Sequence, residues 1–154
     1  MKLNKTELGW ILYDVANSAF ILIVTATIPI YFRALATEAN VADHVISAWF
    51  GGATSTAVII LAILSPILGA IADYKGMKKK MFVGFLAVGI LGALTMTVMT
   101  DWMAFLLLFV LARIGYSACN IFYDSMLVDV AADERMDMLS SMGYAFGYIG
   151  STIP

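Results

Sequence analysis

Residues 64–81 read LSPILGAIADYKGMKKKM, a segment in which a long apolar run ends at Asp73 and four lysines follow between positions 75 and 80. The apolar run behind it, residues 45–72, contains no Asp, Glu, Lys or Arg and is longer than the ~20 residues that cross a bilayer as a helix. A second apolar run begins at Met81. The segment therefore predicts two membrane-spanning helices that are joined by a short basic loop.

The positive charges are distributed unevenly between the two predicted sides of the membrane. Short loops that are rich in Lys and Arg resist translocation and stay on the cytoplasmic side. Arg33 lies on the opposite side, and Arg113 lies within a span. The other Lys and Arg residues share the side of the basic loop: Lys2, Lys5, Lys75, Lys78, Lys79, Lys80 and Arg135. The sequence therefore predicts a cytoplasmic N-terminus.

The composition is that of a membrane protein. Apolar residues make up 62% of the chain and charged residues 13%, against roughly 45–50% and about 25% in globular proteins. This composition predicts an all-α, multi-pass integral membrane protein of a plasma or bacterial inner membrane, in contact with membrane lipid. The single Cys119 excludes an internal disulfide, and without a cluster of His and Cys we expect no metal and no cofactor. No phosphate-binding loop follows Gly51 and Gly52, so nucleotide binding is not supported. We also expect no nucleic-acid partner.

Apolar runs predict five spans, at about residues 8–32, 45–72, 81–100, 102–130 and 138–154. The first run could be mistaken for a signal peptide with a cleavage site near residues 34–36. A retained span is favoured because the run exceeds the roughly 7–15 residues of a signal h-region and is interrupted by Asp14 and Asn17. The last run is about 17 residues long, near the lower limit for a span.

The fourth predicted span carries a stripe of polar side chains. Arg113, Ser117, Asn120 and Asp124 are separated by four, three and four residues, which places all of them within about 40° of Arg113 on one helix face. An ionisable group at the centre of a span costs roughly 2.5–3.5 kcal/mol on the insertion scale, so each one indicates a functional site with a partner. The stripe is therefore a candidate lining of a substrate cavity.

The first predicted span carries a second polar set, with Asp14 and Asn17 near its cytoplasmic end. Together the two spans supply five candidate substrate or coupling residues: Asp14, Asn17, Arg113, Asn120 and Asp124. In the functional interpretation Arg113 attracts an anionic group of a substrate, while Asp14 or Asp124 carries a coupling proton or gates the inner mouth.

A structural interpretation remains open for the same residues. Arg113 can pair with a carboxylate of a neighbouring helix and hold the helices in register without touching a substrate. Asn17 can serve as an interhelical hydrogen-bonding group, and Asp124 can pack at a helix end. Gly143-x-x-x-Gly147, in the fifth run, is either a close packing face for another helix or a substrate-lining face.

Residues 69–80, GAIADYKGMKKK, resemble a loop signature of the major facilitator superfamily. That signature is glycine-x-x-alanine-aspartate-x-x-glycine followed by basic residues, between helices two and three. The sequence departs from it at Tyr74 and Met77, where the general pattern prefers basic residues. More narrowly, three blocks resemble the vacuole-effluxer-like branch of the superfamily: residues 7–10 with 13–20, 122–125 with 127–131, and 140–150.

The resemblance implies a transporter of twelve helices in two six-helix halves that rock around a central site. This chain would supply helices one to five of the N-terminal half, with the missing C-terminal half as its partner. The resemblance also implies a conformational-switch loop, formed by Gly69, Asp73, Lys75 and Gly76, that latches the two halves in the outward-facing state. Fungal members of the branch are associated with amino-acid export from the vacuole. The glycine-proline motif of antiporters is absent, so antiport is not inferred.

The leading hypothesis is a secondary active transporter of small polar solutes such as amino acids, with a small molecule as its substrate. The alternative is a membrane scaffold or assembly partner that does not transport and whose polar stripe serves helix association. Tyr13-Asp14 and Tyr123-Asp124 are similar to the tyrosine-aspartate pair of intramembrane aspartyl proteases, but the partner glycine-x-glycine-aspartate is missing. We therefore expect no enzyme activity.

Overall fold

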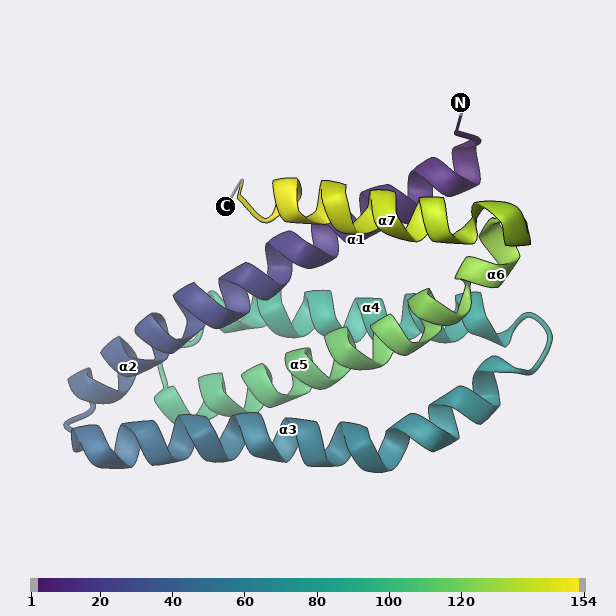
Figure 1. The fold of residues 1–154 in the computed structure, drawn as a ribbon. Coiled ribbons are helices and arrows are strands. Elements are labelled where there is room, and N and C mark those ends of the chain that lie inside the picture. The colour runs from purple at the N-terminus through teal and green to yellow at the C-terminus, as the bar shows by residue number, and fades with distance from the viewer. Residues whose placement is uncertain (1–2, 153–154) are drawn as a thin grey trace. The chain divides into compact units, whose positions relative to one another are not determined.

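The computed structural model describes residues 3–152, which are helical and contain no strand (Figure 1). The all-α class predicted from the sequence is confirmed. In chain order the elements are α1 (Lys5–Leu22), the π-helical segment η1 (Ile23–Thr27), α2 (Ile28–Glu38), α3 (Asp43–Ala72), α4 (Met77–Met96), α5 (Trp102–Ser125), α6 (Leu127–Val130) and α7 (Asp133–Gly150).

Four helices are long and apolar enough to cross a membrane. They are the continuous helix Lys5–Glu38, which comprises α1, η1 and α2, and the single helices α3, α4 and α5. The shorter α7 is not among them, because four charged residues lie in its first two turns: Asp133, Glu134, Arg135 and Asp137. The fifth span expected at 138–154 therefore stays a prediction, and its last two residues lie outside the described residues.

Helix ends differ from the sequence prediction at several places. The first helix continues to Glu38, so Arg33 lies in a helix instead of an outer loop, and its exposed ion pair with Asp43 (2.8 Å) joins two helix ends. α4 begins at Met77, so the lysines at 78–80 occupy its first turn instead of the preceding loop. α5 ends at Ser125, and the short α6 follows where one continuous span to residue 130 was expected. Apolar patterning could not find these ends because backbone hydrogen bonds, which decide where a helix begins and ends, do not follow the limits of an apolar run.

Local sequence signals explain where two of the helices begin. At α1, the Asn4 side chain accepts a hydrogen bond from the Glu7 N–H (2.8 Å), and the Glu7 carboxylate accepts one from the Asn4 N–H (2.8 Å). This capping box satisfies donors that the first turn of a helix leaves free. Before α4, Gly76 has a φ of 77°, a left-handed conformation that glycine adopts without steric cost. Gly76 thus permits the sharp turn between α3 and α4.

The first span contains a π-helical turn just before a proline. In η1, the N–H of Ile28 donates to the carbonyl of Ile23, five residues earlier. Pro29 follows and has no N–H to donate. Such single π turns are rare inside helices. The π turn and Pro29 thus lie next to each other within the continuous helix Lys5–Glu38.

The chain forms two compact units, which are described separately. One consists of residues 1–29 and 126–154, so its described helices are α1, η1, α6 and α7; the other is Ile30–Ser125. In the first unit α7 lies beside α1 (Figure 1). In this unit Ile11 of α1, Leu139 of α7 and Ala131, which precedes α7, form a buried apolar cluster.

In the second unit, α4 and α5 approach each other at glycines. A Cβ atom added at Gly115 would lie 2.7 Å from the backbone N of Gly89 and 3.0 Å from the carbonyl of Phe85. One added at Gly92 would lie 3.0 Å from the Cβ of Ala112. Gly89 and Gly92 thus let the two helices approach closely, whereas Gly84 faces open space.

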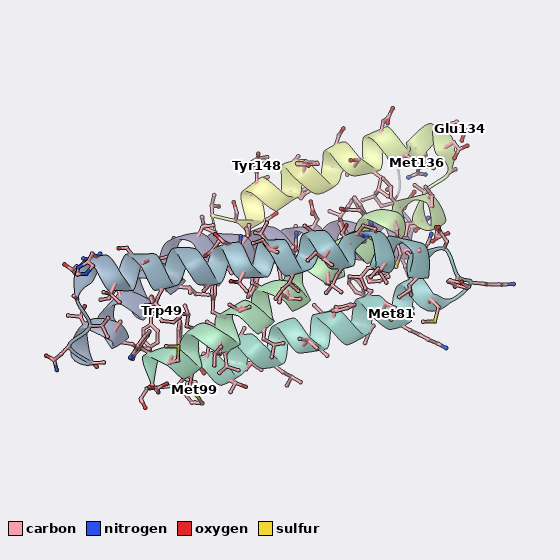
Figure 2. All side chains as sticks on the ribbon, turned by 90° about the horizontal axis from the view of Figure 1, so that it is seen from below. Trp49, Met81, Met99, Glu134, Met136 and Tyr148 are labelled. Carbon is pink, nitrogen blue, oxygen red and sulfur yellow. The ribbon has the colours of Figure 1, made fainter. Side chains whose placement is uncertain are left out.

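Aromatic side chains join α2, α3 and α5 in the same unit. Phe32 is buried between Phe50 (5.5 Å between ring centroids) and Phe105 (6.2 Å). Trp102 packs edge-on against Trp49 (5.9 Å), which remains 46% exposed on α3 (Figure 2). Offset and edge-on ring pairs of this kind stabilise a contact beyond the area that they bury.

The glycine contact between α4 and α5 predicts the effect of a single methyl group. Gly115→Ala forces a methyl against the backbone of α4 and should destabilise the protein by about 1–3 kcal/mol. Gly84→Ala is the matched control because its methyl meets no atom within 4 Å. Thermal unfolding in detergent should show a lower midpoint for Gly115→Ala alone. Equal midpoints for both variants would mean that the helices are not in backbone contact there.

Candidate functional site

The polar stripe of α5 lies away from its glycine contact with α4. Gly115 is two residues beyond Arg113, about 200° around the helix. Arg113, Ser117 and Asn120 are half-buried, and Asp124 is exposed. The stripe predicted from the sequence is therefore a continuous polar face on a helix whose other side is packed.

Arg113 stands out within the stripe. Its guanidinium makes no hydrogen bond or ion pair with any of residues 3–152. Asn120 and Asp124, in contrast, each have a partner in the chain. The neighbouring carboxylate that the structural interpretation assigns to Arg113 is thus not found among the described residues. A guanidinium that no acceptor satisfies is costly in hydrocarbon.

Asp14 lies on the face of α1 that meets α7. A Cβ atom added at Gly143 would lie 3.2 Å from the Asp14 Oδ2, and one added at Gly147 would lie 3.1 Å from the same oxygen. The Oγ of Ser18 would be 2.7 Å from the added atom at Gly147. Glycines on α7 therefore leave the space that the Asp14 carboxylate occupies. Asn17, the remaining candidate on α1, is half-buried and has a partner in the chain.

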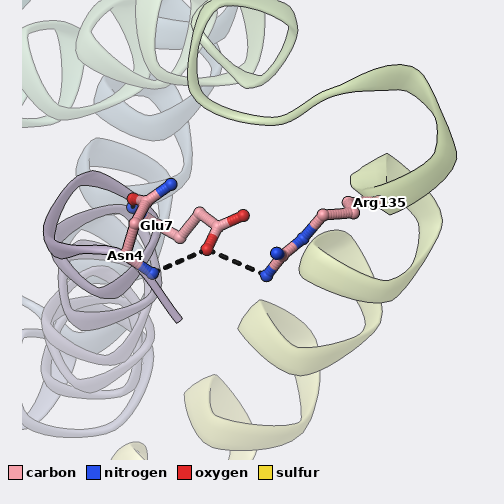
Figure 3. Close-up of polar contacts among 3 residues, drawn as sticks. All are labelled: Asn4, Glu7 and Arg135. Carbon is pink, nitrogen blue, oxygen red and sulfur yellow. Dashed lines mark hydrogen bonds and ion pairs between the residues drawn. The ribbon is translucent and has the colours of Figure 1, made fainter. Parts of the chain in front are cut away.

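A buried ion pair joins the starts of α1 and α7. Glu7 is only 2% exposed, and its Oε2 accepts hydrogen bonds from the Arg135 Nη2 (3.0 Å) and from the Asn4 N–H (2.8 Å), as Figure 3 shows. A buried carboxylate must be paired and hydrogen-bonded to be tolerated. Sequence reasoning missed this pair. The signals were the Asn4-x-x-Glu7 capping box and the single cation, Arg135, within the acidic run 129–137.

The predicted switch loop follows α3. Gly69 lies in the last turns of α3, Asp73 is its exposed C-terminal cap residue, and Lys75 and Gly76 are exposed in the turn. Just beyond, the Lys78 Nζ donates a hydrogen bond to the carbonyl of Ser125 at the end of α5 (3.0 Å). A lysine at a helix C-terminus satisfies a carbonyl that the helix leaves free. The start of α4 is thus bonded to the end of α5, while Asp73, Lys75 and Gly76 in the loop remain exposed.

Metal ligation has no structural support in the part of the chain that the structure describes. No three or more His, Cys, Asp or Glu side chains come together there in a way that could hold a metal ion. The single Cys119 is buried, and its Sγ lies 3.6 Å from the carbonyl of Phe82.

These features define a class, helical multi-pass membrane proteins that carry ionisable groups on their spanning helices. Residues 47–153 match the model of the family described as Vacuole effluxer Atg22 like, and the chain belongs to that family. The resemblance to the vacuole-effluxer-like branch of the major facilitator superfamily is confirmed.

Two curated relatives match the chain. It is 41% identical over 156 residues to "Uncharacterized MFS-type transporter YxiO" of Bacillus subtilis (strain 168), an alignment that covers 99% of this chain and 36% of the relative. It is 34% identical over 92 residues to "Uncharacterized protein" of Aquifex aeolicus (strain VF5), covering 58% of this chain and 23% of that relative. The chain thus spans about a third or less of the length of these relatives. No solved structure matches it.

The buried ion pair predicts a strong effect on stability. Arg135→Met leaves the Glu7 carboxylate buried without its cation and should lower the free energy of unfolding by about 3 kcal/mol. Glu7→Gln combined with Arg135→Met removes both charges and should recover part of that loss. Asp137→Asn, an exposed position on α7, is the control.

Chemical unfolding in detergent of these three variants, of Glu7→Gln alone and of the unchanged protein provides the measurement. Strictly additive losses in the double variant would contradict a direct Glu7–Arg135 interaction.

Proposed function

We propose that this chain forms helices one to five of a secondary active transporter that moves small polar solutes, such as amino acids, across a membrane. Membership of the family supports a transporter of the MFS type. Arg113 is the main support for a substrate site, because it is a half-buried cation in a span and has no counter-ion among the described residues. A substrate carboxylate can supply that counter-ion through two parallel hydrogen bonds.

The proposal includes an orientation and a partner. The uneven distribution of Lys and Arg favours a cytoplasmic N-terminus and a cytoplasmic loop at 73–76. The remainder of the transporter, beyond the five helices, would complete the central site. Asp73, Lys75 and Gly76 would contact that remainder in one conformational state and release it in the other, which their exposure permits.

A scaffold function without transport is the second candidate. The close glycine contact between α1 and α7 favours it, because small residues at this spacing promote helix association. The two functions differ in what Arg113 does. In a transporter it binds solute, whereas in a scaffold it serves only to hold helices together.

Substitution of Arg113 separates the two functions. In the full-length transporter reconstituted in lipid vesicles, Arg113→Gln should reduce uptake of radiolabelled amino acids by roughly ten- to a hundredfold, because a hydrogen bond to a charged group is lost. Its unfolding midpoint should change little. Arg33→Gln is the matched control, since Arg33 makes only an exposed ion pair with Asp43. Normal uptake by Arg113→Gln, with a lowered unfolding midpoint, would favour the scaffold.

Cysteine labelling tests the orientation. Cys119 is buried, so a cysteine introduced at an exposed site reports its own accessibility. A membrane-impermeant maleimide added to intact cells should label Asn40→Cys, in the turn after α2. It should label Lys79→Cys only after the membrane is permeabilised. The opposite pattern would place the N-terminus outside the cell.

A further inference from the structure

We propose that Trp49 and Trp102 form a surface that binds the glycerol-ester layer of a phospholipid membrane and marks where one leaflet meets water. Both residues lie within the unit Ile30–Ser125, so this tryptophan pair does not depend on how the two compact units are arranged. The proposal concerns contact with lipid and goes beyond the transporter function proposed above. It holds whether or not the protein transports a solute.

The two rings come from different helices and pack on each other. Trp49 lies near the start of α3 and Trp102 is the first residue of α5, and their ring centroids are 5.9 Å apart at an interplanar angle of 69°. The buried ring of Phe32 also packs against Trp102, with 6.3 Å between the centroids. Trp49, in contrast, remains 46% exposed (Figure 2). The tryptophan pair therefore has one packed side and one open side.

The indole N–H groups of both residues need an acceptor outside residues 3–152. Neither donates a hydrogen bond to a described residue, and their interactions within that part of the chain are ring contacts alone. The N–H of a tryptophan only donates, and it usually finds a partner where bulk water is excluded. An apolar ring with an unused donor fits the ester and glycerol oxygens of lipid, which is why tryptophan is enriched at membrane surfaces.

Charged side chains lie on one side of the tryptophan pair. Asp43, the first residue of α3, forms an exposed ion pair with Arg33 (2.8 Å). Asp101, just before α5, is exposed and accepts a hydrogen bond from the Ala104 N–H through its Oδ1 (2.7 Å). Ionised groups are costly in hydrocarbon, so this end of both helices belongs outside it.

Aliphatic side chains lie on the other side of the tryptophan pair. The exposed ones are Val58, Ile59, Ile63 and Ile67 on α3, and Leu107 and Leu111 on α5. Between Trp49 and Ala72 the sequence has no Asp, Glu, Lys or Arg. An exposed apolar surface of this kind marks contact with a membrane. The tryptophan pair therefore lies where the exposed surface changes from charged to apolar.

The lengths of the two helices agree with a boundary at this level. Residues 49–72 of α3 and 102–125 of α5 each extend about 35 Å at 1.5 Å per residue, slightly more than the ~30 Å of a hydrocarbon core. Near the other ends of these segments, Ala72 and Phe122 share a buried cluster, so the two helices are level there as well. The whole of α3 is about 45 Å long and would not fit upright within the core. A boundary at Trp49 leaves its first two turns in the polar region.

Lipid fits the open side of the tryptophan pair better than another spanning helix does. The backbone carbonyls of a spanning helix are bonded within that helix, so it offers no free backbone acceptor to an indole N–H. The ester carbonyls of a phospholipid are free acceptors, and they lie beside the acyl chains that the rings and the aliphatic side chains contact.

Fluorine NMR of the full-length protein in lipid nanodiscs tests the contact. After labelling with fluorotryptophan, the resonance that disappears in Trp49→Phe is assigned to Trp49, the more exposed ring. A phospholipid with a nitroxide near its glycerol should broaden this resonance beyond detection, and reduction of the nitroxide with ascorbate should restore it. A phospholipid with the nitroxide at the end of an acyl chain should leave the resonance visible.

Two results of that experiment would overturn the proposal. Loss of the resonance with the acyl-chain nitroxide alone would place the ring deep in the hydrocarbon. Survival of the resonance with both lipids would mean that water or another part of the protein, instead of lipid, surrounds the tryptophan pair.

Cysteine substitutions on the two sides of Trp49 test the boundary itself. His44→Cys lies about 8 Å before Trp49 along α3 and Ser55→Cys about 9 Å after it, and both positions are exposed. In nanodiscs, where both membrane faces are accessible, a water-soluble maleimide should label His44→Cys and should fail to label Ser55→Cys. The unchanged protein gives the background, since Cys119 is buried. Labelling of both positions, or of neither, would contradict a boundary at Trp49.

Discussion

The hydrocarbon of a membrane offers no hydrogen-bond partner, and this constraint organises the chain. Backbone groups are satisfied within helices, which is why residues 3–152 contain no strand and few irregular stretches. Charged side chains face the same requirement. Glu7 forms an ion pair with Arg135 and accepts a hydrogen bond from the Asn4 N–H, and Lys78 donates a hydrogen bond to the carbonyl of Ser125 at the end of α5. Asp14 and Arg113 have no such partner among the described residues, which marks them as functional candidates.

The fold class and the four long apolar helices were predictable because both follow from the apolar composition of long segments. An apolar run such as 45–72 is a strong signal, and it corresponds to α3 within two residues at its start. The break after Ser125 and the extension to Glu38 were not predictable, since they depend on backbone hydrogen bonds that apolar patterning does not encode. The π turn before Pro29 belongs to the same group: the proline was visible, but its accommodation was not.

The candidate site was predictable in part. Helical periodicity identified the stripe on α5 correctly, because spacing along one helix fixes which side chains share a face. It could not show that Gly143 and Gly147 meet Asp14, since contacts between residues far apart in sequence depend on how helices pair. For the same reason the sequence did not predict the Glu7–Arg135 ion pair, because its two residues are far apart in the chain.

The first turn of α4 carries three lysines at a position where positive charge destabilises a helix. Lys78, Lys79 and Lys80 lie at a helix N-terminus, where the helix dipole opposes positive charge by about 0.3–1 kcal/mol per residue, and neither an acidic side chain nor a side-chain cap offsets it. A chain selected for stability alone would carry Asp or Glu there. The lysines therefore lower the stability of the helix that they begin, and an acidic side chain in place of Lys79 or Lys80 would raise it.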